Sequence, residues 1–401
     1  MDFSFVKNTF HSFFRILQSR YKWLLIFFCI WFYRIAYIPA DSGGIAKALQ
    51  VGCIAAMFVL LILYQKYKRA NIFEARNKPI VTLLCVYVFA TLTSVFSELP
   101  QYAFFLSVQD VVILFLLYWI FSIPKTFIGL ERLFLMMYLI MMFSQMFFIR
   151  QVSYWWTLFV HDLSSGSCSA LVISYCVGEL LAERRHDKSR IRILRTVAVL
   201  AIFNIIVCTS SGANLSAVFG VSIGLLFSGK ILYALFLGLV ALFFSMNSSA
   251  FETIVYFIMP GKNVQTVETV TGRDIIWQAI YKVAQESPFL GAGLGCSERI
   301  AFDRGYMPVP QPDPHSNFIG CYCNLGIWGC VMFIIHLLSS LSFVLKRKRR
   351  TGYVGLLSVL GCATLNGYTY GFLVSKTCGI TIVYFAFIML MYYYSKVTRY
   401  V

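Results

Sequence analysis

The chain has 401 residues, of which 59% are hydrophobic and 13% are charged, and its mean hydropathy is +0.74. This composition excludes a water-soluble globular enzyme and predicts a polytopic membrane protein. The formal net charge of +17 is scattered over separate connections, which favours membrane topology and contact with anionic membrane lipids and argues against nucleic-acid binding.

Apolar runs long enough to cross a bilayer recur along the chain and predict an all-α protein with about twelve transmembrane helices. They lie at 22–38, 44–63, 79–96, 103–123, 133–149, 164–182, 193–208, 215–228, 231–249, 315–343, 352–371 and 379–395. A single long polar segment interrupts them. We therefore divide the chain into an N-terminal bundle of about nine helices (1–249), an outer loop (250–314) and C-terminal helices (315–401).

Lys and Arg residues gather on alternate connections, and basic connections stay on the cytoplasmic side of a membrane. They precede the first span, fill the connections at 66–78 and 184–192, form the run KRKRR at 346–350 and follow the last span. This pattern predicts that both termini are cytoplasmic and that the long loop lies outside the cytoplasm. Long loops in compact proteins are often functional, so we expect the site there.

The sequence of the outer loop predicts its local structure. Asp274 in a first turn and apolar residues at helical spacing predict a short amphipathic helix over about 273–286. Pro288 ends this helix, and Gly291, Gly293 and Gly295 predict a flexible turn after it. Four prolines between 308 and 314 are expected to exclude helix in the stretch CSERIAFDRGYMPVPQPDPHSN (296–317) until His315, where the next span begins.

Metal binding is not predicted. Cys321 and Cys323 lie two apart on an expected helix, so their side chains point to different faces. The carboxylates of the loop form no paired acidic motif of the kind that metal-dependent transferases use, and they are hard to arrange as the two carboxylates of a glycoside hydrolase. We expect no metal and no cofactor.

Several of these residues, in this order, resemble the bacterial O-antigen ligase and polymerase superfamily. The matching positions are Gly272–Arg273, Pro288, Gly291–Gly293, His315–Ser316–Asn317 and Leu325–Gly326–Ile327–Gly329. The resemblance covers about a fifth of the chain closely, and the helix count and the place of the long loop agree with it. Each motif alone is weak, and their order and spacing carry the resemblance.

The resemblance implies a glycosyltransferase of the GT-C kind in the bacterial inner membrane, with a periplasmic active site and no nucleotide sugar. The donor would be a glycan on undecaprenyl diphosphate. In ligases of the superfamily the acceptor is a sugar of the lipid A core, and in polymerases it is another lipid-linked repeat.

Two residues suit the chemistry of such a transfer. Arg273 could hold the departing diphosphate through paired, charge-assisted hydrogen bonds, and His315 could accept the proton of the incoming hydroxyl. Each has a structural alternative: Arg273 as a headgroup contact or the partner of a nearby carboxylate, and His315 as a helix N-cap. Asp313 would orient His315 or cap the helix, and His161 is a rival base.

The sequence departs from the superfamily at one position. Gly212 stands where ligases resembling this chain carry an arginine thought to bind diphosphate, so the second phosphate contact is unassigned. The start of the following helix is one substitute, because helix N-termini favour anions. The further candidate substrate contacts are Ser210, Ser211, Asn214, Asn317, Arg150, Arg299, Arg304 and Lys376.

We favour an O-antigen ligase because the chain has one dominant outer loop. The nearest alternative is an O-antigen or capsule repeat-unit polymerase, which uses the same donor. A lipid-linked glycan transporter is the alternative from another class. It would be expected to carry charges at mid-membrane, and here the charged Lys47 and Glu179 lie near the ends of spans.

Overall fold

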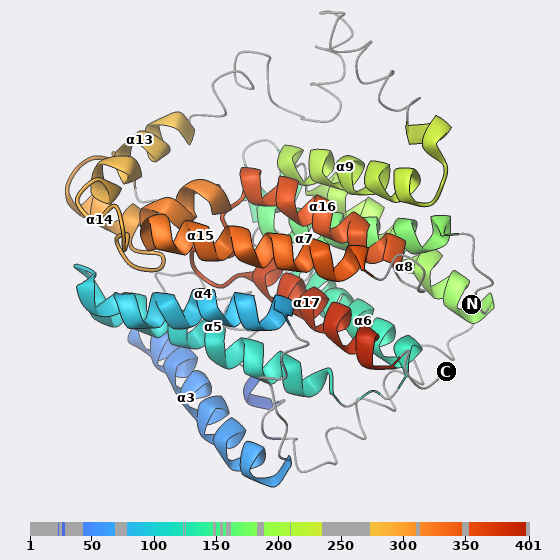
Figure 1. Ribbon diagram of the computed structural model, residues 1–401. Coiled ribbons are helices and arrows are strands. Elements are labelled where there is room, and N and C mark those ends of the chain that lie inside the picture. Colours follow the sequence, from blue (N-terminus) through green and yellow to red (C-terminus); the bar gives the residue numbers. More distant parts are fainter. Residues whose placement is uncertain are drawn as a thin grey trace, which may run out of the picture.

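The computed structural model describes residues 23, 26–28, 43–68, 78–122, 124, 126–146, 150–152, 155–157, 162–182, 188–208, 210–234, 273–309, 313–346 and 353–397. Its long helices are α3 (Gly43–Lys68), α4 (Lys78–Thr93), α5 (Pro100–Ile120), α6 (Phe127–Met146), α7 (Asp162–Leu181), α8 (Lys188–Val207), α9 (Ser211–Phe227), α15 (Asn317–Leu345), α16 (Tyr353–Thr369) and α17 (Gly379–Val397) (Figure 1). The shorter elements are η1 (Ser94–Phe96), α13 (Arg273–Ala284), α14 (Ser297–Asp303) and an antiparallel hairpin of β1 (Arg150–Val152) and β2 (Trp155–Thr157).

The predicted membrane spans coincide with these long helices, apart from the first and the ninth, most of which lie outside the described residues. Within the described part, Lys78–Phe96, Pro100–Ile120 and Asn317–Leu345 are long and apolar enough to cross a membrane by length and composition. Shorter apolar helices occur at Ala48–Leu63, Gly212–Phe227 and Gly379–Tyr393. The all-α architecture with several apolar helices agrees with a polytopic membrane protein.

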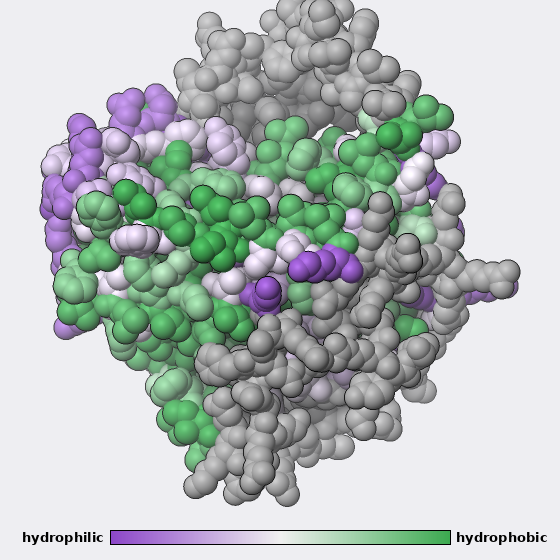
Figure 2. All heavy atoms as spheres, in the orientation of Figure 1, coloured by the Kyte–Doolittle hydropathy of each residue, from purple (hydrophilic) through white to green (hydrophobic). Residues whose placement is uncertain are grey.

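Apolar side chains cover the flank of the bundle seen in Figure 2, whereas hydrophilic side chains gather at the end formed by α13 and α14. Large apolar side chains on different helices are more than half exposed, among them Leu92 at 67%, Val199 at 65% and Leu338 at 60%. Soluble proteins rarely expose so extended an apolar surface. Such a flank is suited to lipid.

Helix α17 forms the centre of the bundle. Each residue from Ile382 to Tyr392 is at most 2% exposed, as expected for a helix that is apolar on all sides. Elsewhere in the bundle, α7, α9 and α16 approach one another closely through small residues. A Cβ added at Gly178 would lie 2.8 Å from the Cα of Gly355, so neither position accepts a larger side chain without separating α7 from α16.

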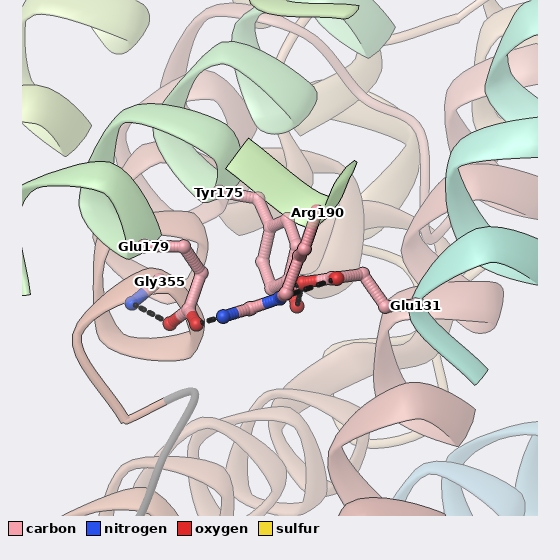
Figure 3. Close-up of polar contacts among 5 residues, drawn as sticks. All are labelled: Glu131, Tyr175, Glu179, Arg190 and Gly355. Carbon is pink, nitrogen blue, oxygen red and sulfur yellow. Dashed lines mark hydrogen bonds and ion pairs between the residues drawn. The ribbon is translucent and has the colours of Figure 1, made fainter. Parts of the chain in front are cut away.

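A buried ion-pair network ties four helices together (Figure 3). Arg190 Nε donates to Glu131 Oε2 at 2.7 Å, and its Nη2 contacts Glu131 Oε1 and Glu179 Oε2, each at 2.6 Å. The Tyr175 hydroxyl donates to Glu131, and the backbone N–H of Gly355 donates to Glu179. Glu131 lies near the start of α6, Glu179 near the end of α7 and Arg190 near the start of α8, so the network lies at helix ends, as expected for Glu179. Both carboxylates pair with the arginine, which offsets the burial of the three charges.

The two ends of the bundle differ in charge. One end, which we call the site end, holds α13, α14, the start of α15 and the end of α16 (Figure 1). The described basic residues at the other helix termini lie at the opposite end: Lys78 begins α4, Lys188 begins α8 and Lys346 follows α15. This asymmetry agrees with the orientation predicted from sequence.

Helix α15 is broken where the chain carries the motif LGIWG. Gly326 has φ 66° and ψ −167°, so it is not helical. The groups freed by the break pair with residues 288–293, through Ile327 N–H to Pro288 O (2.9 Å), Trp328 N–H to Phe289 O (3.4 Å), Ala292 N–H to Cys323 O (2.9 Å) and Gly293 N–H to Asn324 O (2.9 Å). At about 1.5 Å per residue, Ile327–Leu345 alone approaches the ~30 Å hydrocarbon core. The predicted span at 315–343 is thus a short outer helix followed by a membrane helix.

Two expectations for the outer loop are wrong, and one is confirmed. Helix α13 forms at Arg273–Ala284, within the predicted range. The glycine-rich turn is not an exposed flexible turn, since Gly291, Gly293 and Gly295 are buried with positive φ. Helix α14 forms at Ser297–Asp303, where the prolines were expected to exclude helix. The first of those prolines, Pro308, follows α14 by more than one turn and does not affect it.

Candidate functional site

Arg273 is the first residue of α13, at the site end. Its partner in the motif, Gly272, lies outside the described residues. The guanidinium is partly buried, and burial lowers its pKa, while the charge of the nearby Asp313 opposes that shift. Arginine still remains charged at neutral pH. Asp313 therefore provides the electrostatic link between α13 and the segment that carries the histidine.

His315 lies two residues before α15 and adopts a left-handed φ of 52°. Asp313 Oδ1 accepts its backbone N–H at 2.7 Å and lies 3.2 Å from its Nδ1. The His315 side chain is 15% exposed. A proton on Nδ1 directed at Asp313 leaves Nε2 as the acceptor, the tautomer that a base needs.

The helix cap at this site is Ser316 rather than His315. Helix α15 begins at Asn317, and the Ser316 hydroxyl accepts the N–H of Ile319 at 3.4 Å. The reading of His315 as the N-cap is therefore wrong. Its left-handed backbone places the imidazole outside the helix, beside Asp313.

Pro314 fixes the histidine segment against two other elements. The Trp277 indole N–H donates to Pro314 O at 2.9 Å, which joins α13 to the residue before His315. On the other side, a Cβ added at Gly371 would lie 2.9 Å from the Pro314 ring and 3.3 Å from the backbone nitrogen of Ser316. The segment after α16 can pass this closely because it has glycine there.

Residues 370–378 form a buried, non-helical segment between α16 and α17. Asn317 Oδ1 accepts the N–H of Leu373 at 2.8 Å, and the Leu373 carbonyl accepts the Tyr87 hydroxyl at 2.8 Å. Asn324 Nδ2 donates to Val374 O at 2.9 Å. Asn317, a candidate substrate contact by sequence, is only 1% exposed and has this structural contact.

Glu298 is a buried acid that sequence reasoning did not select. It is 2% exposed in α14, and Asn324 Nδ2 lies 3.4 Å from its Oε1. Burial raises the pKa of Glu298 to about 7, the charge of Asp313 adds to the shift, and Asn324 and Lys376 oppose it. Glu298 thus interacts electrostatically both with Asp313 and with the exposed Lys376 on the 370–378 segment.

Arg299 and Arg304 both contact carboxylates on the described surface. Arg299 lies 3.8 Å from Asp303, and its guanidinium lies 5.4 Å from the ring centre of Tyr102. Arg304 pairs with Glu98 and Glu286, which raises the pKa of Arg304. These pairs join α14 to neighbouring segments.

The start of α9 lies near the same glycine-containing segment as Pro314. Ser210 is 3% exposed at the N-cap position, and Asn214 is partly exposed. A Cβ at Gly212 would lie 2.5 Å from Thr369 Oγ1, so an arginine at this position would displace Thr369. Gly371, two residues further on, contacts Pro314. The start of α9 and the histidine segment thus flank residues 369–371.

Three candidates cannot be placed. The side chains of Ser211 and Arg150, and the whole of His161, lie outside the described residues. Among the residues that the structure does describe, no group of three or more His, Cys, Asp or Glu side chains is arranged to hold a metal ion.

Part of the sequence matches a known family. The sequence model of the O-antigen ligase family matches residues 196–334. This segment is an O-antigen ligase family domain. The domain makes up about a third of the chain and contains Gly212, Arg273, Glu298 and His315, together with the interlocked loop and helix break. A search of curated proteins finds no match to the chain.

The O-antigen ligase domain does not contain the whole site. Its matched range ends within α15, whereas Gly371, Leu373 and Lys376 lie beyond it. These residues support Pro314, Asn317 and Glu298 from the segment after α16. Part of the described geometry is therefore built by residues outside the family match.

Proposed function

We propose that the protein is an O-antigen ligase that transfers a glycan from undecaprenyl diphosphate to a sugar of the lipid A core. The observation that carries the proposal is the Asp313–His315 pair next to the partly buried Arg273, within an O-antigen ligase family domain. The three residues belong to two segments that meet at the hydrophilic end of an apolar bundle (Figure 2). These contacts support a proposed base and a proposed anion-binding group in one site.

The proposed reaction breaks the bond from the anomeric carbon to the diphosphate oxygen and forms a bond from that carbon to the acceptor oxygen. The bonding electrons leave with undecaprenyl diphosphate, whose developing charge Arg273 stabilises. The acceptor hydroxyl gives its proton to His315 Nε2. Asp313 lies 3.2 Å from the opposite nitrogen and stabilises the charged imidazolium that forms.

Lys376 is our choice for the second phosphate contact. It is exposed on an otherwise buried segment. Its charge lowers the pKa of Glu298, whereas the charge of Asp313 raises that pKa. Arg299 and Arg304, which pair with carboxylates, stay further candidates. The N-terminus of α9 with Ser210 and Asn214 stays a secondary candidate, on the far side of residues 369–371.

The proposed location is the bacterial inner membrane, with both termini in the cytoplasm and the site facing the periplasm. The basic termini of α4, α8 and α15 at the opposite end of the bundle support this orientation. The proposed division keeps residues 250–314 as the outer loop. Its described part is docked on α15 through residues 288–293 rather than separate from the bundle.

The test uses purified protein with undecaprenyl-diphosphate-linked O-antigen and lipid A–core, compared with Arg273→Ala, His315→Ala and the exposed control Lys282→Ala. We expect transfer by the wild type and by Lys282→Ala, and at least about a hundredfold slower transfer by the other two variants. Each variant is checked for folding by size-exclusion chromatography. Lengthening of the donor glycan without transfer to the core would identify a polymerase. Neither reaction with competent substrates would refute the glycosyltransferase proposal.

A further inference from the structure

Helix α13 carries Arg273, Trp277 and Tyr281 at successive intervals of four residues. Residues at this spacing lie above one another on a helix, so the three form a row that starts at Arg273. The row lies beside the buried face made by Ala279, Ile280, Val283 and Ala284. Trp277 is partly exposed and Tyr281 is 48% exposed, so both rings keep accessible surface.

Trp277 is held in a defined orientation next to His315. Its indole N–H donates to Pro314 O, and its ring centre lies 6.5 Å from that of Tyr368, at an interplanar angle of 67°. Tyr368 belongs to the last turn of α16 and is 52% exposed. The indole ring of Trp277 has a single donor group, its N–H, and this group is bonded to the protein itself. The exposed part of the aromatic pair is therefore apolar ring surface.

Tyr281 forms a second aromatic pair one turn further along the row. Its ring centre lies 5.9 Å from that of Tyr322 on α15, at an interplanar angle of 30°. Tyr322 is partly buried, so it supports Tyr281 from the side of the bundle. Two supported aromatic positions thus follow Arg273 in sequence order along α13.

The exposed faces of these aromatic rings are suited to binding sugars. The apolar C–H faces of pyranose rings pack on aromatic faces, which are electron-rich. Four helical residues rise about 6 Å, which is close to the length of one sugar unit in an extended glycan. With the diphosphate at Arg273, the first sugar reaches Trp277 and the following sugars reach Tyr281.

We infer that Trp277 and Tyr281, supported by Tyr368 and Tyr322, form a binding track for the sugars of the lipid-linked donor glycan. The inference rests on the proposed function, because it takes the position of the diphosphate from Arg273. The competing explanation is an aromatic anchor at the membrane surface. An anchor usually leaves its polar group to the headgroup region, whereas the Trp277 N–H is engaged by Pro314.

The first experiment compares donors that carry one sugar or several repeat units on undecaprenyl diphosphate. The variants are Tyr281→Leu, Trp277→Phe and Phe289→Leu, a control because Phe289 is 59% exposed in the outer segment and off α13. We expect Tyr281→Leu to raise the KM for the long donor about tenfold and leave the single-sugar donor unchanged. Trp277→Phe keeps a ring but loses the N–H, so we expect it to raise the KM for both donors. Phe289→Leu should resemble the wild type.

If Tyr281→Leu raises the KM equally for both donors, or if Phe289→Leu raises the KM for the long donor as much as Tyr281→Leu does, the track is refuted and an anchor is favoured. A second measurement does not require transfer. The oligosaccharide released from the lipid is titrated into each protein, and binding is followed by calorimetry. Weaker binding by Tyr281→Leu supports the track even where the wild type transfers nothing, and equal binding by all variants overturns it. Failure of the track and failure of the proposed function are thus distinguished.

Discussion

Asp313 meets His315 through a single oxygen, which accepts the backbone N–H at 2.7 Å and lies 3.2 Å from the imidazole Nδ1. The carboxylate therefore fixes the backbone of the histidine and lies close to its ring. It also opposes the effect of burial on the pKa of Arg273. One side chain thus serves the proposed base and the proposed phosphate contact.

We predict that Asp313→Asn lowers kcat at least about tenfold, because an amide can still accept the backbone N–H but cannot stabilise the imidazolium. The thermal midpoint should stay close to that of the wild type. Steady-state transfer kinetics and thermal unfolding in detergent measure the two effects. Asp303→Asn, at the exposed Asp303 that faces Arg299, is the matched control. An unchanged kcat would remove Asp313 from the proposed mechanism.

A pH dependence of stability is expected from Glu298. Burial raises its pKa to about 7 from an ordinary value of 4.5, so between these values the folded protein binds more protons than the unfolded chain. Stability contributed by this group is therefore lost as the pH rises from about 4.5 to 7. Glu298→Gln cannot ionise at this position. We therefore predict that the thermal midpoint of the variant, measured relative to that of the wild type, is higher at pH 8 than at pH 4.5.

Glu286 provides the contrast for that measurement. It is exposed, and its pairing with Arg304 lowers its pKa, so its contribution is present at high pH and lost as the pH falls. Glu286→Gln should therefore show a small relative change of the opposite sign. The same sign in both variants would contradict the assignment for Glu298.

The break in α15 should be intolerant of a side chain. A Cβ at Gly326 would lie 2.4 Å from the carbonyl carbon and oxygen of Phe289, and its φ is positive. We predict that Gly326→Ala undocks residues 288–293 and abolishes transfer or folding. Gly305→Ala is the control, since Gly305 also has a positive φ but no neighbour within 4 Å, and it should cost only about 1–2 kcal/mol.

Thermal unfolding and size-exclusion chromatography compare the two glycine variants. Equal effects would show that backbone strain alone, rather than the contact with Phe289, makes Gly326 necessary. A folded Gly326→Ala protein with wild-type transfer would show that the interlock is not needed for the site.

The ion-pair network at the opposite end predicts a large stability effect without a direct effect on chemistry. Among the described residues, Glu131→Ala removes one of the two carboxylates that contact the buried Arg190, and breaking a buried pair costs about 3–5 kcal/mol. We expect a thermal midpoint lower by several degrees, while the donor KM of the folded fraction stays unchanged. Arg195→Ala, an exposed position on the same helix α8, should have little effect.

The sequence predicted those features that depend on local pattern. Periodic apolar residues and Asp274 were sufficient for α13, and the apolar runs were sufficient for the long helices. The nearness of Asp313 and His315 follows from their separation of two residues. Motif order was sufficient to place Arg273 and His315 in one family domain.

Features that depend on distant partners were not predictable. Gly326 lies inside an apolar run, and only its contact with Phe289 distinguishes it from a helical glycine. Arg190 was counted with a basic connection, because its partners Glu131 and Glu179 lie on other helices. Glu298 had no sequence signal, since its burial depends on Asn324 and on the segment after α16.

The interlock between residues 288–293 and the break in α15 has a consequence for biogenesis. The outer loop is synthesised before the helix that completes its backbone hydrogen bonds. The hydrogen-bond partners of Asn317 and Asn324, residues 373 and 374, are synthesised later still. In the proposed orientation, the loop crosses the membrane without its final partners and docks only after α16 has inserted. The site is therefore completed only after residue 374 has been made, so a nascent chain that ends before residue 373 carries the family motifs but not the architecture that joins them.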